Sequence, residues 1–189
     1  NAGKICAKAG YSLQILYRVK TMKYEIYIFE EVKTASFYKK AIAEYEKRLS
    51  RYCKIACRFV KKEREWEKLL AEAADAGNVC LVQPGPDSVT SESFSQTIGQ
   101  WEMSGQGKKQ FFIPAAHFAG MEGGSTPKYH KDDKDDIDDT EDSGDKDKTE
   151  NTEILNLSDF TMNTAMTAMI LYEQIYRGYR ILNHHPYHK

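Results

Sequence analysis

The sequence has little of what marks secreted, zinc-binding or membrane proteins. Its 189 residues include only four cysteines, at irregular spacings and without a C-x-x-C pair. Neither a disulfide framework nor a common zinc site is indicated, and reduced thiols are expected. No apolar run approaches the ~20 residues that a membrane-spanning helix needs, and "YSLQILY" near the start is too polar for a signal-peptide core. We therefore expect a cytoplasmic protein without a membrane partner.

The sequence also lacks an excess of charge of one sign, because its formal net charge is -1. The charges are nevertheless unevenly distributed. Residues 1–21 carry four cations and no acid, whereas residues 128–150 carry eleven acids and five lysines. The rest of the chain is close to neutral, so a nucleic-acid site has to be a local basic patch rather than a field of the whole protein.

The length and the 41% hydrophobic content predict one globular domain. A plausible start, "MKYEIYIF", begins at Met22, so we expect residues 1–21 to be an extension outside a single domain at 22–189. Residues 128–150 have too few apolar side chains to fold and are predicted to be a disordered surface insertion. Part of it, "DTEDSGDKDKTE", weakly resembles an EF-hand calcium loop. Recruitment of a cation or of a basic partner by this insertion is therefore a minor alternative.

Short apolar runs alternate with longer periodic segments along the domain. This order predicts an α/β fold, with a mostly parallel sheet flanked by helices. The expected strands and helices occupy the following ranges: strands 23–29, 54–60, 78–83, 110–114 and 153–158, and helices 36–52, 63–77, 91–103 and 162–182. Gly77 is expected to close the second helix.

The first predicted helix has an apolar stripe and a basic side. The stripe recurs at steps of four and three residues and consists of Tyr38, Ile42, Tyr45, Leu49 and Tyr52. The other side carries Lys39, Lys40, Lys47, Arg48 and Arg51. A solvated face is one interpretation, supported by Glu44 four residues before Arg48. Contact with nucleic-acid phosphates is the other.

Two segments, "AIAEYEKRLSRYCK" and "EQIYRGYRILNHHPYHK", carry a specific resemblance. Through them the chain resembles the bacterial 23S rRNA pseudouridine N3-methyltransferases of the SPOUT superfamily, from Met22 to Lys189 apart from the acidic insertion. The resemblance implies a C-terminal trefoil knot and S-adenosylmethionine as the cofactor. It also implies 23S rRNA in the ribosome as the partner, with no role for DNA, and a homodimer in which the tail of one subunit reaches the cofactor of the other.

The resemblance also implies the cofactor-binding residues, which lie in loops at the ends of three strands. They are Val82, Pro114, Ala115, Ala116, Leu157, Ser158, Asp159, Phe160, Thr161 and Met162. The family has two glycines after the fourth strand, where this chain has Ala115 and Ala116. A non-catalytic paralogue that binds RNA or the ribosome but has lost the cofactor is therefore the alternative function.

The resemblance places the catalytic residues near the C-terminus: Arg177 in the last predicted helix, and Tyr187 and His188 in the tail after it. Methylation of N3 requires removal of its proton, and His188 is a suitable base because an unperturbed histidine has a pKa of ~6.5. Arg177 would hold a phosphate or the uracil oxygens, and Tyr187 would stack on or hydrogen-bond to the base. Three alternatives remain open: a surface ion pair for Arg177, a metal site formed by the tail histidines, and a frayed terminus.

Overall fold

The computed structural model describes residues 21–30, 32–86, 88–115 and 152–186. The predicted N-terminal extension lies almost wholly outside these ranges, and the acidic insertion with its calcium-like loop lies entirely outside them. The described residues form nine elements: β1 (Lys23–Phe29), α1 (Ser36–Leu49), β2 (Lys54–Val60), α2 (Glu63–Asp75), β3 (Val79–Gln83), α3 (Ser91–Met103), β4 (Lys108–Ile113), β5 (Glu153–Asn156) and α4 (Thr164–Leu182).

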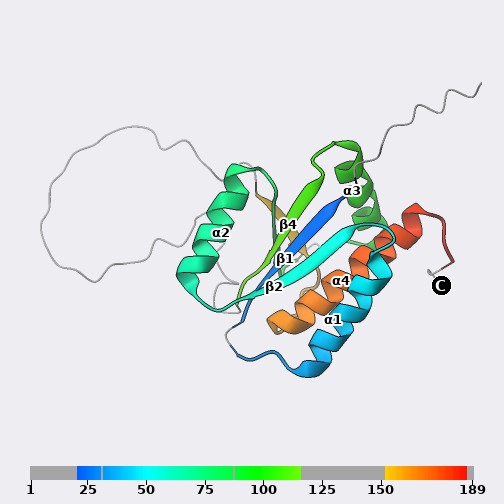
Figure 1. The fold of residues 1–189 in the computed structure, drawn as a ribbon. Coiled ribbons are helices and arrows are strands. Elements are labelled where there is room, and N and C mark those ends of the chain that lie inside the picture. The colour runs from blue at the N-terminus through cyan, green and yellow to red at the C-terminus, as the bar shows by residue number, and fades with distance from the viewer. Residues whose placement is uncertain (1–20, 31, 87, 116–151, 187–189) are drawn as a thin grey trace, which may run out of the picture.

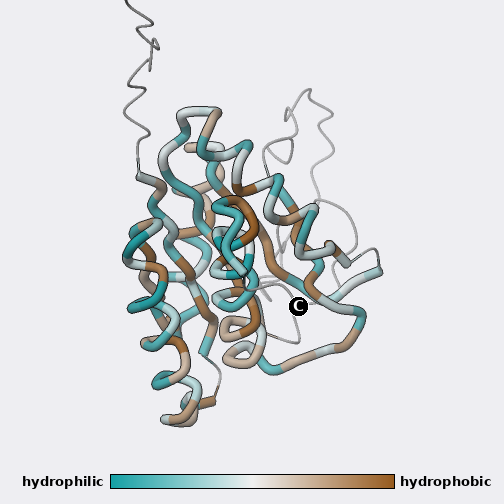
Figure 2. The backbone as a smooth tube through the Cα atoms, turned by 90° about the vertical axis from the view of Figure 1, so that its right-hand side faces the viewer, coloured by the Kyte–Doolittle hydropathy of each residue, from teal (hydrophilic) through white to brown (hydrophobic). Residues whose placement is uncertain are grey.

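The five strands form one sheet in the order β2-β1-β4-β3-β5. Every pairing between them is parallel. The helices α1, α3 and α4 cover one face and α2 lies on the other (Figure 1). The predicted α/β fold with a mostly parallel sheet is therefore confirmed. Many of the most hydrophobic residues lie in the strands at the centre of the molecule (Figure 2).

The larger core lies between the sheet and the three helices α1, α3 and α4. It forms because alternate strand residues point to this side, as Tyr24, Ile26 and Ile28 do from β1. The Tyr24 and Tyr179 hydroxyls lie 3.1 Å apart and satisfy each other inside this core. Gly178 lets α4 approach α3 closely, because a Cβ atom there would lie only 2.6 Å from Ile98 Cδ1.

The smaller core lies beneath α2. Trp66 of this helix makes edge-to-face contacts with Phe29 and Phe112, with ring centroids 5.6 and 5.3 Å apart. Alternate residues of β1 and β4 thus pack on α2, while their sequence neighbours pack on the opposite side. Both faces of the sheet are covered in part, as expected for parallel strands.

The predicted strand at 110–114 begins two residues too late. Lys108 and Lys109 look like the end of a loop because both are charged, yet both belong to β4. The side chain of Lys109 is fully buried, and its Nζ lies 2.5 Å from Glu153 Oε1 on β5. Glu153 lies 44 residues further along the chain. No local sequence pattern therefore predicts this ion pair.

Three further observations bear on the sequence predictions. The turn after α2 contains Gly77 at a φ of 65°, as expected for a helix terminator. Cys53, Cys57 and Cys80 are free thiols. No helix among the described residues is long and apolar enough to cross a membrane. Because the path of residues 116–151 lies outside the described ranges, the trefoil knot remains a prediction.

Candidate active site

The loops expected to hold the cofactor follow β3, β4 and β5. These strands are neighbours in the sheet and run in the same direction, so their C-terminal ends meet at one edge. Open α/β sheets generally bind ligands at this edge. The structure therefore brings Val82, Pro114, Ala115 and the segment 157–162 to a common region, while Ala116 lies outside the described residues.

Hydrogen bonds tie the loop after β3 to the loop after β5. Gly85 N–H donates to the Ser158 carbonyl at 3.1 Å, and Val89 N–H donates to the Asn156 carbonyl at 3.1 Å. The Asn156 side-chain amide donates to the Pro86 carbonyl at 2.8 Å. A Cβ atom on Gly85 would lie 3.0 Å from the Asn156 side chain. Glycine is therefore the residue that lets these two loops join.

The joined loops also leave groups available to a ligand. Asn156 Oδ1 is buried and accepts no hydrogen bond from the described residues. A buried acceptor without a donor is costly, so a site of this kind suits a polar ligand that donates to it. The aromatic ring of Phe160 is 79% exposed, and its backbone N–H donates to Ser158 Oγ at 3.0 Å. An unpaired acceptor and an exposed aromatic residue thus suit a ligand that carries a hydrogen-bond donor and a flat ring.

Ala115 does not obstruct this edge. Its side chain is fully buried in the core beneath α2, together with Trp66 and Phe112. Val82 is also buried, in the larger core on the opposite face. Both side chains are therefore core groups and do not occupy the space at this edge.

The other part of the predicted site lies near the end of α4. Arg177 Nε donates to Glu173 Oε1 at 3.0 Å, one helical turn away, and the Arg177 side chain remains 32% exposed. This ion pair is the alternative that the sequence analysis left open for Arg177. Tyr187 and His188 lie outside the described residues.

The base of the tail is fixed to the end of α1. Tyr52 stacks on Tyr179 with ring centroids 5.2 Å apart, and its hydroxyl lies 3.1 Å from His185 Nδ1. His184 has a φ of 52°, in the left-handed region, so the chain turns sharply just after α4. These contacts set the direction in which the tail leaves the domain.

The two parts of the predicted site lie at opposite ends of one helix. The cofactor loop leads into the start of α4, and the tail follows its end (Figure 1). A helix of 19 residues is roughly 28 Å long at 1.5 Å per residue. The described residues of one chain therefore do not bring the cofactor loops and the base of the tail together.

Sequence reasoning missed four residues of this region: Gly85, Asn156, Tyr52 and Glu30. The Pro-Gly-Pro run around Gly85 was a usable signal, since such runs mark special turns. Tyr52 belonged to an apolar stripe that predicted only core packing. Asn156 ended a predicted strand and carried no distinguishing pattern.

Glu30 is a buried carboxylate at the C-terminal end of β1, with a side chain only 4% exposed. It accepts a hydrogen bond from Thr34 N–H at 2.9 Å, and Lys61 and Lys39 lie 3.4 and 3.8 Å away. Burial alone would raise the pKa of this carboxyl, but the hydrogen bonds from Thr34 and the two lysines lower it. Glu30 thus stays ionised and fixes the loop between β1 and α1.

Comparison with known proteins identifies the fold and its chemistry. A family described as "Predicted SPOUT methyltransferase" matches residues 22–124 and 143–188. The chain belongs to this family. It is 31% identical to ribosomal RNA large subunit methyltransferase H of Shouchella clausii over 171 residues, which cover 81% of this chain and 91% of that protein.

Two other relatives carry the same name. The protein from Bifidobacterium animalis subsp. lactis is 28% identical over 165 residues, covering 79% of this chain and 89% of its own length. One from Thermoanaerobacter pseudethanolicus is 27% identical over 168 residues, covering 89% and 100%. Membership of a methyltransferase family supports an enzyme that uses a methyl donor. The non-catalytic alternative is not favoured.

Proposed function

We propose that this protein transfers a methyl group from S-adenosylmethionine to N3 of a pseudouridine in 23S ribosomal RNA, in the cytoplasm where ribosomes are made. The observation that carries the proposal is the meeting of the β3, β4 and β5 ends, where the loop containing Gly85 is tied to Asn156 and Ser158. The names of the relatives support the choice of large-subunit RNA as substrate.

The cofactor would be held mainly by backbone groups of the three loops. Val82, Pro114, Ala115 and Ala116 would line it from two strand ends, and the segment 157–162 from the third. Asn156 Oδ1 would accept a hydrogen bond there. S-adenosylmethionine supplies an electrophilic methyl group when bound.

The tail would act on the target base. His188 would take the N3 proton and so turn N3 into a nucleophile. Tyr187 would stack on the base or hydrogen-bond to it, and Arg177 would hold a phosphate or the uracil oxygens. The contact between His185 and Tyr52 would limit the directions open to these last residues, which contributes to the rate through orientation.

The active site would be completed by a second copy of the chain. The loops and the base of the tail lie at opposite ends of α4, so the tail of one subunit would serve the cofactor loops of its partner. A homodimer built in this way contains two equivalent composite sites.

Calorimetric titration with S-adenosylmethionine tests the proposal most simply, with ATP as the control ligand. We expect micromolar binding of the methyl donor, and methylation of large ribosomal subunits that lack the modification, detected by mass spectrometry of the digested RNA. Absence of donor binding at millimolar concentration would overturn the proposal.

A further inference from the structure

The most basic region of the folded domain is the unit formed by α1 and β2. Residues 33–62 contain ten cations and only two acids. On α1, and on the turn that continues it, Lys40, Lys47 and Arg51 follow one another at steps of seven and four residues. They therefore share the helix side opposite the buried Ile42 and Leu49. We call these three residues the basic stripe.

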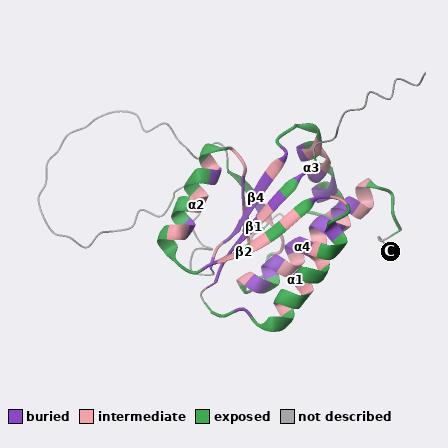
Figure 3. Cartoon of the chain, in the orientation of Figure 1, coloured by how far each residue is buried: buried purple, intermediate pink, exposed green. Residues whose placement is uncertain are grey.

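The stripe runs along a solvent-facing surface. All three side chains are exposed, and Figure 3 shows the outer side of α1 as mostly exposed. At 1.5 Å per residue the stripe spans roughly 16 Å. Arg51 lies in the turn that directly follows α1, in which the Tyr52 and Cys53 N–H groups donate to the Leu49 carbonyl at 2.8 and 3.0 Å.

The charge of the stripe is not neutralised by the neighbouring acids. Glu44 is paired with Arg48 at 2.9 Å, and Glu46 accepts a hydrogen bond from Tyr172 at 2.8 Å. Among the described residues, none forms an ion pair with Lys40, Lys47 or Arg51. The ion pair between Glu44 and Arg48 that the sequence indicated is thus present, and it leaves these three cations outside it.

The stripe is continuous with the base of the tail. The Arg51 guanidinium lies 5.9 Å from the centroid of the Tyr52 ring, and the Tyr52 hydroxyl contacts His185. The helices α1 and α4 lie side by side, and both end on the same side of the domain (Figure 1). A polyanion that follows the stripe would therefore reach the tail.

We propose that the basic stripe binds the sugar-phosphate backbone of the substrate RNA and leads the strand to the tail. The identity of that RNA rests on the proposed function. The chemistry favours nucleic acid over an acidic protein, since protein interfaces have an apolar centre. Here the small Ala43 is the exposed apolar residue between the cations, and Phe37 lies at one end of the stripe, one turn before Lys40. Phosphate contacts require only spaced positive charges.

The test compares two triple variants that each remove three exposed cations. One is Lys40→Gln/Lys47→Gln/Arg51→Gln in the stripe, and the matched control is Lys62→Gln/Arg64→Gln/Lys68→Gln at the start of α2. The affinity for large ribosomal subunits is measured over a series of KCl concentrations. We expect the stripe variant to bind roughly 10- to 100-fold more weakly, with the slope of log K against log [KCl] shallower by about 2 to 3. The control should change less than threefold.

Three outcomes would overturn the proposal. The first is unchanged binding by the stripe variant, and the second is equal weakening by both variants, which would show only a general effect of charge. The third is tight binding of polyglutamate without binding of subunits, which would assign the stripe to an acidic protein. Circular dichroism and melting temperature establish that both variants are folded.

Donor binding separates this proposal from the proposed function. The stripe variant should bind S-adenosylmethionine as the wild type does, because its three side chains are exposed on α1 and the turn after it, whereas Gly85 follows β3 and Asn156 ends β5. If the wild type binds no donor while the stripe still controls subunit binding, the enzymatic assignment fails and the RNA surface stands.

Discussion

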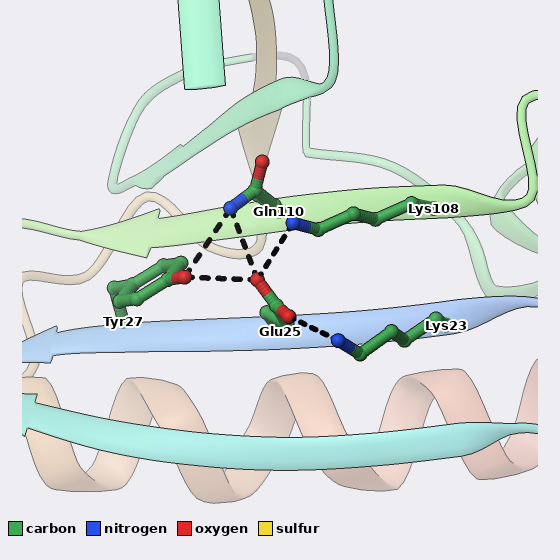
Figure 4. A network of polar contacts seen from close by, with 5 residues as sticks. All are labelled: Lys23, Glu25, Tyr27, Lys108 and Gln110. Carbon is green, nitrogen blue, oxygen red and sulfur yellow. Dashed lines mark hydrogen bonds and ion pairs between the residues drawn. The ribbon is translucent and has the colours of Figure 1, made fainter. Parts of the chain in front are cut away.

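The two ends of the sheet are built in different ways. At the N-terminal end, Glu25 of β1 receives contacts from every polar neighbour shown in Figure 4. Lys23 lies at 2.6 Å, the Tyr27 hydroxyl at 2.8 Å, Lys108 at 3.0 Å and the Gln110 amide at 3.1 Å. At the C-terminal end, backbone hydrogen bonds join two loops and leave Asn156 Oδ1 without a donor among the described residues.

The two ends therefore have different roles: the contacts of Glu25 stabilise the fold, and the loops at the other end are available for binding. Lys54, Lys23 and Lys108 lie opposite one another on three adjacent strands, and like charges in this arrangement repel. Glu25 offsets that repulsion through its contacts with Lys23 and Lys108. The N-terminal ends of β1 and β4 are thus satisfied by their own side chains, whereas the loops after β3 and β5 keep a polar and an aromatic group for a ligand.

The base of the tail lies with the first of these ends and the cofactor loops with the second. Arg177 and His185 are on the last turns of α4 or beyond it, while Ser158 and Phe160 precede the helix. The cofactor loops and the base of the tail are therefore separated within one chain. The proposed active site combines the loops of one subunit with the tail of the other. Three variants test these regions one at a time: a truncation of the tail, Gly85→Val in the cofactor loops and Glu25→Gln at the N-terminal end of the sheet.

The largest effect is expected from removing residues 187–189. Loss of a general base and of the groups that orient the target should lower the single-turnover rate of methyl transfer by at least about a hundredfold. The affinity for S-adenosylmethionine should change much less, because the loops after β3, β4 and β5 rather than the tail are proposed to hold the cofactor. Lys189→Ala alone is the control and should keep the wild-type rate. Full activity of the truncated protein would show that residues 187–189 are not needed for catalysis.

A smaller effect, on donor binding, is expected from Gly85→Val at the C-terminal end of the sheet. The added side chain would collide with Asn156, which a Cβ atom alone already approaches to 3.0 Å, and the joined loops would separate. We expect calorimetry to show donor binding weakened by about ten- to a hundredfold, equivalent to roughly 1.4 to 2.8 kcal/mol. Gly99→Ala on α3 is the matched control, since a Cβ there meets only Leu182 Cδ2, at 3.3 Å. Equal effects of both substitutions would remove the special role of Gly85.

The smallest effect is expected from Glu25→Gln, which should leave donor binding and catalysis intact. Burial opposes ionisation of this carboxyl, but hydrogen bonds from Lys23, Lys108 and Tyr27 outweigh it and lower the pKa from 4.5 to about 2. At pH 7 we expect the variant to lose roughly 1 to 2 kcal/mol of unfolding free energy, measured by urea denaturation.

The difference in unfolding free energy between the wild type and Glu25→Gln should become smaller as the pH falls. A carboxyl with a lowered pKa stabilises the fold above its unfolded value, and this stabilisation is lost as the pH falls through the folded value. The wild type should therefore converge on the variant between about pH 4.5 and about pH 2. Glu44→Gln on α1, whose ion pair with Arg48 is exposed, is the control at pH 7 and should change the unfolding free energy little.

The sequence predicted the elements well, because their signals are local. The alternation in "KYEIYIF" and the stripe of α1 depend only on neighbouring residues, and the strand at Lys23–Phe29 and the start of α1 at Ser36 follow the prediction. The buried Lys109 was missed because its partner Glu153 comes from a distant strand. The joining of Gly85 to Asn156 was missed because strand order is not encoded locally.

The candidate site was predictable only in part, and for the same reason. Positions of the cofactor loops followed from resemblance, and the sheet then placed them at one edge. The anchoring of the tail by Tyr52 required the stacking of Tyr52 on Tyr179, which joins residues 127 positions apart in the sequence. Ala115, an apparent obstacle in the sequence, proved to be a core residue.

The most direct test of the composite site uses the tail truncation and Gly85→Val together. The two variants are co-expressed with different affinity tags, the mixed dimer is purified through both, and methyl transfer is measured at a donor concentration far below the Kd of Gly85→Val. Each variant alone should be nearly inactive. The mixed dimer should recover about half of the wild-type activity, because one of its two sites combines intact loops with an intact tail. A mixed dimer without activity, or failure to obtain one, would contradict the account.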